Sequence, residues 1–178
     1  MKNWREYIKP VLVLLSIAAV SAFLLAVVDH VTAPTIAENN RKSTYETYYK
    51  VLPEADNFTE LDCDIDGVTA VLKADNGAGY VVTAQSRGYG GQVPAAVSFD
   101  ENGNIIRVIM MANSETPGLG QKVTLASFYD QFAGKKAEKM TVDGIDAVSG
   151  ATISSRASVA AINLAVEAYQ SICGGDAS

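Results

Sequence analysis

One stretch decides the fold class of this chain: VTAVLKADNGAGYVVTA at residues 68–84. Its two ends are rich in β-branched and aromatic side chains, and the middle is made of turn-forming residues. This pattern is typical of a β-hairpin with a longer loop. A second pair of such runs follows at residues 93–99 and 105–111. Four strands in two hairpins predict an antiparallel sheet with one apolar face.

Helical patterns lie on both sides of these strands in the sequence. Residues 35–52 have partial helical periodicity, and residues 123–132 predict a short helix. One more short strand is expected at residues 142–148, and a final amphipathic helix runs to about Ile172. The folded domain is therefore predicted to be α+β, with an antiparallel sheet and flanking helices.

An uncharged apolar run covers residues 11–28. As a helix, this run spans roughly 27 Å, which is just enough to cross the hydrocarbon core of a bilayer. Lys2, Arg5 and Lys9 precede the run and Asp29 follows it. The positive-inside rule therefore places the N-terminus in the cytoplasm and the rest of the chain outside. A cleaved signal peptide is the competing interpretation, but its apolar region is usually shorter, so we favour a retained anchor in the lipid bilayer.

The expected organisation is that of a single-pass protein of the cell membrane. It has a cytoplasmic tail at residues 1–10, a transmembrane helix at 11–28, a helical connector at 29–57 and an extracytoplasmic domain at 58–178. Pro10 is expected at the first position of the transmembrane helix, where proline is tolerated.

Composition excludes several classes of function. The net charge is −6; residues 1–10 contribute +2 and the remainder −8, so no nucleic-acid partner is expected. Cys63 and Cys173 are the two cysteines, and without a Cys-x-x-Cys spacing no zinc or iron–sulfur site is predicted. A disulfide and two free thiols both stay open. His30, the one histidine, lies just after the apolar run, so a histidine-based catalytic triad is excluded.

A glycine-rich loop is expected between the two hairpins, at residues 86–93. Within this loop, three of the four residues at 88–91 are glycine, which allows a ligand to approach the backbone closely. Arg87 beside them can pair with a phosphate or a carboxylate. A solvated arginine on a surface turn is the plainer interpretation, and we prefer it for this loop taken alone.

A second loop follows the hairpins, at residues 113–120. Pro117 and Gly118 are the pair favoured at the centre of a type II turn, from which Leu119 would project. Such a loop can lay Leu119 and bare backbone against a flat aromatic ring, with Glu115 and Thr116 at the polar edge of the ring. An ordinary tight turn before a helix is the plainer alternative.

A third segment, residues 146–155, forms a turn that opens into the final helix. Gly150 permits a backbone conformation that other residues resist. Four hydroxyl groups surround the predicted helix start, where unpaired backbone N–H groups favour an anion. A simple N-cap explains the same residues, and physical chemistry alone favours it. The four hydroxyl residues are Ser149, Thr152, Ser154 and Ser155.

Taken together, the three segments resemble the FMN-binding domain of membrane electron-transport complexes. The motifs are Gly-Tyr-Gly-Gly at 88–91, Glu-Thr-Pro-Gly-Leu-Gly at 115–120 and Asp-x-x-Ser-Gly-Ala-Thr at 146–152. With its anchor and short domain, the chain is most similar to the G subunits of Rnf complexes. The C subunits of sodium-translocating NADH:quinone oxidoreductases share these motifs but are generally longer.

The resemblance implies that a flavin transferase joins FMN through its phosphate to Thr152, which makes residues 58–178 an FMN-binding domain. It implies no catalytic residue. The family often has histidine where this chain has Asn113, so any role of that histidine is in doubt. Seven further cofactor-binding residues follow from the motifs, the first four at the ring and the others at the attachment turn: Glu115, Thr116, Gly118, Leu119, Ser149, Gly150 and Ala151.

The function implied by the resemblance is that of a redox carrier within a larger complex rather than a complete enzyme. The complex would transfer electrons between ferredoxin and NAD and couple this to ion translocation, with other membrane and electron-carrier subunits as partners. Two flavin-binding alternatives are a member of the quinone-reductase C subunits and a stand-alone extracytoplasmic flavoprotein. A third is a binding domain without flavin, in which Thr152 is only a helix cap.

Overall fold

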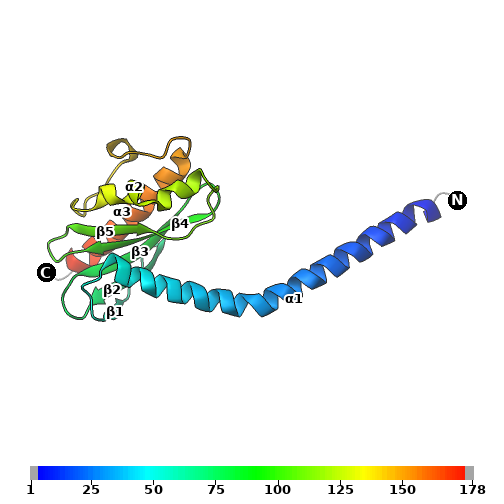
Figure 1. Cartoon of the computed structure of the whole chain (residues 1–178), viewed down its shortest axis with the longest axis horizontal. Helices are drawn as coiled ribbons and strands as arrows, with labels where there is room; N and C mark the ends of the chain where they lie inside the picture. Colours follow the sequence, from blue (N-terminus) through cyan, green and yellow to red (C-terminus); the bar gives the residue numbers. More distant parts are fainter. Residues whose placement is uncertain (1–3, 175–178) are drawn as a thin grey trace. The chain divides into compact units, whose positions relative to one another are not determined.

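The structure, a computed structural model, describes residues 4–174, so Lys2 of the expected tail lies outside it. The chain divides into two compact units between Thr44 and Tyr45. The first unit belongs to helix α1, and the second contains the end of α1 and the whole sheet (Figure 1).

Helix α1 is one continuous helix, Trp4–Val51. The expectation that a helix begins at Pro10 and a separate one at Thr35 is wrong, because Pro10 and Pro34 both lie inside α1. A proline removes one backbone hydrogen bond, and no glycine between residues 11 and 51 supplies a flexible break. By length and composition, α1 contains a segment apolar enough to cross a membrane.

Five antiparallel strands form a single sheet in the order β1-β2-β3-β4-β5 (Figure 1). The four predicted strands are present, and the short, partly polar strand β1 was not predicted separately. This confirms the predicted α+β class with an antiparallel sheet. The strands are β1 (Phe58–Leu61), β2 (Val68–Ala74), β3 (Tyr80–Arg87), β4 (Gln92–Phe99) and β5 (Ile105–Met110).

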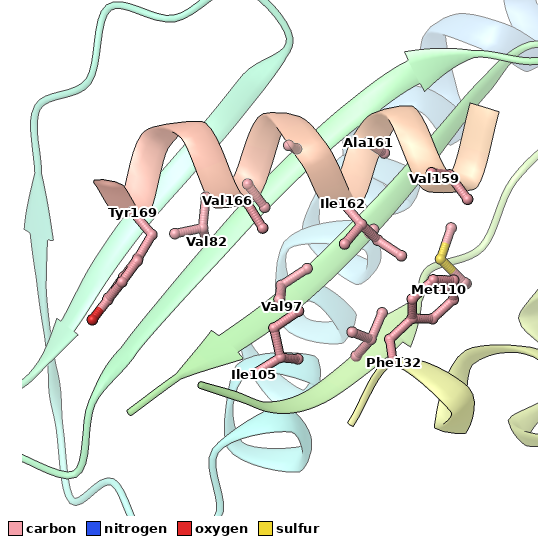
Figure 2. Packing of buried hydrophobic residues seen from close by; sticks show 14 of the residues in the cluster. Val82, Val97, Ile105, Met110, Phe132, Val159, Ala161, Ile162, Val166 and Tyr169 are labelled. Carbon is pink, nitrogen blue, oxygen red and sulfur yellow. The ribbon is translucent and has the colours of Figure 1, made fainter. Parts of the chain in front are cut away.

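One face of the sheet is covered by helix α3, Thr152–Gly174. Figure 2 shows Ile162 and Val166 of α3 packed over Val82 and Val97, which are paired neighbours in β3 and β4. All four side chains are buried. This packing fixes the axis of α3 against the sheet and so places the N-terminal end of α3.

The opposite face of the sheet is buried as well, so the expectation of one apolar face is wrong. Val81 and Ala96 face away from α3 and pack with Tyr48, Val51 and Leu52 from the end of α1 and the residue after it. Since both β3 and β4 are covered on two sides, residues 81–84 and 95–99 are buried without alternation.

The connections between β5 and α3 contain short helices only. The predicted helix at 123–132 is divided into η1 (Gly120–Thr124), α2 (Ala126–Tyr129) and η2 (Asp130–Phe132). The predicted strand at 142–148 is wrong, because η3 (Val142–Gly144) and irregular backbone replace it. Part of the free edge of β5 is taken by another segment: Ile105 N–H donates to Lys135 O at 2.8 Å.

Candidate functional site

A pocket of about 400 Å³ lies at the N-terminal end of α3. Three segments that are far apart in sequence meet there: the loop between β3 and β4, the loop after β5, and the turn into α3. The pocket is lined by Tyr89, by Glu115, Thr116, Leu119 and Gly120, and by the run from Gly150 to Ser154.

The loop after β5 has the backbone that a type II turn requires. Leu119 N–H donates to Thr116 O at 3.2 Å, and Gly118, at the third position, has a φ of +72°. A side chain at position 118 would be strained at this angle. The turn presents Leu119 on the pocket wall with 41% of its surface exposed.

The turn into α3 depends on Gly150, which has a φ of +77°. The first helical hydrogen bond runs from Ser155 N–H to Ala151 O at 2.9 Å, which places Ala151 in the N-cap position. Alanine is a poor N-cap. Thr152 is therefore the first residue within the helix rather than its cap.

The four hydroxyl groups of this turn have different environments. Ser154 is 3% exposed and donates to Glu115 Oε2 at 2.5 Å, and buried Ser155 accepts from Val148 N–H at 3.0 Å. Ser149 and Thr152 are exposed. Within residues 146–155, Thr152 is thus the one hydroxyl residue that is both exposed and part of the pocket wall.

Glu115 connects all three segments of the site. Its side chain is 1% exposed, and its Oε1 atom accepts from Gly90 N–H at 2.8 Å while Oε2 accepts from Ser154. A β-carbon at Gly120 would lie 2.9 Å from Oε2, and one at Gly88 would collide with Oε1. Glycines of two motifs therefore leave the space that this carboxylate occupies.

Asn113, which stands where the resemblance leads one to expect histidine, supports the loop of Glu115. Its Oδ1 atom accepts from Glu115 N–H at 3.1 Å, and its Nδ2 atom donates to Met111 O at 3.3 Å. Its side-chain amide therefore fixes the backbone just before the turn.

Most of the predicted site residues meet at this pocket. Six of them line it: Glu115, Thr116, Leu119, Gly150, Ala151 and Thr152. Gly118 and Ser149 do not line the pocket, although each is next in sequence to a residue that does. Arg87 lies elsewhere, exposed beside a separate hollow next to Gln85 and Asp66.

Tyr89, Gly120, Ile153 and Ser154 line the pocket but were not predicted to do so. Tyr89 is 74% exposed in the glycine-rich loop, and an aromatic residue among glycines was a usable signal. Ile153 and Ser154 follow Thr152 directly in the first turn of α3. Whether they line the pocket therefore depends on the position of α3 relative to Glu115.

Comparison with known proteins identifies both parts of the chain. A model of the RnfG N-terminal region matches residues 1–51, and a model of the FMN-binding domain matches residues 88–167. The G subunit of the proton-translocating ferredoxin:NAD(+) oxidoreductase complex of Clostridium ljungdahlii is 32% identical over 163 residues, which is 88% of each chain. The G subunit of the Na(+)-translocating complex of Acetobacterium woodii is 31% identical and covers 96% of this chain and 95% of its own.

Two solved structures have a similar fold. The C subunit of the Na(+)-translocating NADH-quinone reductase of Parabacteroides distasonis superposes with a TM-score of 0.54 at 21% identity, covering 74% of this chain and 83% of that one. NqrC of Shewanella oneidensis gives a TM-score of 0.53 at 24% identity and covers 67% and 70%. These likenesses show a shared fold. The two matching models and the relatives together show that the chain belongs to the family of G subunits of ion-translocating oxidoreductase complexes.

Proposed function

We propose that this chain is a membrane-anchored electron-transfer subunit that carries FMN on Thr152 through a phosphoester bond. The observation that carries the proposal is the position of Thr152, an exposed residue of the pocket wall at the N-terminus of α3. The nearby serines of the helix are buried and hydrogen-bonded.

The complex proposed for the chain is a ferredoxin:NAD oxidoreductase that couples electron flow to ion translocation. This rests on the names of the two G subunits that are similar to it over most of their length. Since these relatives are named for different ions, the proposal extends only to ion translocation as such. Other membrane and electron-carrier subunits are the proposed partners.

The pocket fits a flavin mononucleotide in size and chemistry. About 400 Å³ lies within the range of cofactor sites. Leu119, Tyr89 and Ile153 offer exposed apolar surface to a flat ring. The N-terminus of a 23-residue helix favours the negative charge of a phosphate. FMN supplies the redox chemistry when bound, and the chain holds and orients it.

Attachment requires an alcohol oxygen and an activated phosphate. Thr152 Oγ1 would form the new P–O bond on a flavin dinucleotide held by a flavin transferase. The pyrophosphate bond of the dinucleotide breaks, a nucleoside monophosphate leaves, and the hydroxyl proton passes to the transferase. Exposure of Thr152 on the first turn of α3 lets a second protein reach it.

The membrane placement is part of the same proposal. The apolar segment of α1 crosses the lipid bilayer, with the N-terminus in the cytoplasm and the domain on the extracytoplasmic side. A covalent bond removes the dissociation equilibrium of the cofactor, which is useful where no cytoplasmic flavin can replace a lost molecule. The match of residues 1–51 to the RnfG N-terminal region favours this family over the quinone-reductase C subunits.

The test asks whether flavin stays attached to the chain after denaturation. After co-expression with a flavin transferase, the full chain should give a fluorescent band on a denaturing gel and a mass increase of one FMN ester. Thr152→Val should abolish both, because valine keeps the shape but lacks the hydroxyl. Thr141→Val is the matched control, since it is the same substitution at an exposed threonine that does not line the pocket, and it should leave the signal unchanged. A dark band from the unchanged chain, or a mass increase retained in Thr152→Val, contradicts the proposal.

A further inference from the structure

We infer that Glu115 is a positioning residue: it holds the glycine-rich loop at 88–91 and the first turn of α3 in the arrangement in which Thr152 accepts the flavin phosphate. The inference rests on the proposed function. It assigns Glu115 a task that differs from the predicted contact with the ring, because both of its carboxylate oxygens are already bonded to the protein.

The contacts of Glu115 join two segments that lie far apart in the sequence. Gly90 belongs to the connection between β3 and β4, and Ser154 is the third residue of α3. Each donates to a different oxygen of the same carboxylate, at 2.8 and 2.5 Å. The side chain of Glu115 therefore sets the distance between the two walls of the pocket.

Both contacts use the carboxyl group of Glu115 as the acceptor. An oxygen–oxygen distance of 2.5 Å is that of a short hydrogen bond between a hydroxyl and a carboxyl group. A carboxyl group that is 1% exposed is costly to bury unless hydrogen-bond partners surround it. Gly90 N–H and the hydroxyl of Ser154 supply donors, and the positive end of the α3 dipole lies beside them. Removing the hydroxyl of Ser154 thus leaves a buried oxygen of Glu115 without its donor, so the side chain is no longer fixed on that side.

The same contact selects the hydroxyl that accepts the flavin. Ser154 lines the pocket, as Thr152 does, and lies only two residues further along α3. Its proton is engaged by Glu115, whereas Thr152 faces solvent. Because the helix is held by Ser154, the hydroxyl of Thr152 is kept at a fixed place on the pocket wall.

A matched pair of serine variants separates positioning from general packing. Ser154→Ala removes the hydroxyl that bonds Glu115. Ser158→Ala is the control, since Ser158 is equally buried one turn further on, and its hydroxyl donates to Ser154 O at 2.9 Å instead of to Glu115. Both variants lose one buried hydroxyl from the same helix.

Two measurements on the full chain in detergent are required. The first is the rate of FMN incorporation by purified transferase, followed by intact mass, with kcat and KM separated. We expect Ser154→Ala and Glu115→Ala to lower kcat about tenfold or more, because small displacements of a reacting group are costly. Ser158→Ala should stay near the unchanged protein. Glu115→Gln should retain most of the rate, since its amide can accept from Gly90 and bond Ser154.

The second measurement is amide hydrogen exchange of residues 88–91 before any flavin is added. Ser154→Ala and Glu115→Ala should speed exchange there while β3 and β4 stay protected. Equal exchange in Ser154→Ala and Ser158→Ala overturns the inference, as does an unchanged incorporation rate in Glu115→Ala. If the unchanged chain takes up no flavin, the proposed function fails, and exchange alone decides the inference: faster exchange in Ser154→Ala supports it and equal exchange overturns it.

Discussion

Leu119 packs directly over Gly150, across two loops that lie about thirty residues apart in the sequence. A β-carbon built on Gly150 would lie 3.2 Å from Leu119 Cδ1, which is closer than most such contacts in proteins. Gly150 also has a φ of +77°. The wall of the pocket therefore depends on a position that has neither a side chain nor an ordinary backbone conformation.

Gly150→Ala is expected to damage the site for both of these reasons. Alanine at positive φ costs about 1–2 kcal/mol, and its methyl group displaces Leu119 or the turn. We expect a lower melting temperature and slower FMN incorporation. Gly144→Ala is the matched control, because nothing lies within 4 Å of a β-carbon there and its φ is outside the positive region. Equal effects of the two variants would contradict the role of Gly150.

Much of the fold followed from local patterns. The runs at 68–74 and 80–84 lie in strands because they are rich in β-branched residues and flank a loop of turn-forming residues, which is a local signal. Two errors arose where tertiary structure overrides such signals. The separate helix expected from Thr35 is part of α1, which continues through Pro34. Val142, Ile145 and Val148 pack against the core from η3 and the irregular backbone after it instead of forming a strand.

The members of the site were predictable from motifs, but their connections were not. Thr152, Leu119 and Glu115 each stand out in a short pattern, and each lines the pocket. Glu115 can bond Gly90 and Ser154 only at one position of α3 along the sheet. Core packing sets this position, for example at Ile162, and no spacing in the sequence encodes it.

Ile162→Ala should destabilise the domain by about 2–5 kcal/mol. Ile162 is fully buried between α3 and the sheet, and truncation leaves a cavity that the neighbouring strands cannot fill (Figure 2). Chemical denaturation of the full chain in detergent measures the loss. Ile106→Ala is the matched control with a 38% exposed side chain, and its effect should be clearly smaller. A loss at Ile162 no greater than at Ile106 would contradict the described core.

Stability should fall at acidic pH through Asp100, which orders the loop between β4 and β5. Burial alone would raise the pKa of Asp100, but hydrogen bonds from Asn104 and Asn102 outweigh burial and lower this pKa below its ordinary value. A lowered pKa means that the stabilisation is fully present above the unfolded value of about 4. It is lost as the pH falls through the folded pKa.

Asp100→Ala should therefore lower the free energy of unfolding by about 1–3 kcal/mol at pH 7, and by less as the pH approaches 3. Denaturation curves between pH 3 and pH 7 measure the difference. Glu101→Ala, at an exposed neighbouring position, is the control and should change little. A constant difference between Asp100→Ala and the unchanged chain across this range would show that ionisation of Asp100 is not involved.

The proposed orientation in the membrane predicts which of two introduced cysteines reacts with a reagent added outside the cell. In a chain with Cys63 and Cys173 replaced by serine, Lys9→Cys and Lys139→Cys are a matched pair at exposed positions on opposite sides of the apolar run. A membrane-impermeant maleimide added to intact cells should label Lys139→Cys and not Lys9→Cys. Both should react after lysis. Labelling of Lys9→Cys alone would reverse the orientation.

The end of α1 is held to the sheet by two side chains that bond its last carbonyl groups. Ser98 Oγ donates to Val51 O at 2.8 Å, and Arg107 donates to Lys50 O at 2.6 Å. Ser98 is fully buried in β4. Ser98→Ala leaves Val51 O without this donor, which should cost about 1–3 kcal/mol.

The expected consequence of Ser98→Ala is local as well as global. Amides from Tyr48 to Leu52 should exchange faster with solvent than those at the centre of α3, because the sheet contact that ends α1 is weakened. Ser171→Ala, at an exposed position of α3, is the control and should leave this exchange unchanged. If exchange in α3 rose as much as in residues 48–52 of Ser98→Ala, the hydroxyl would contribute to the stability of the whole domain and not specifically to the end of α1.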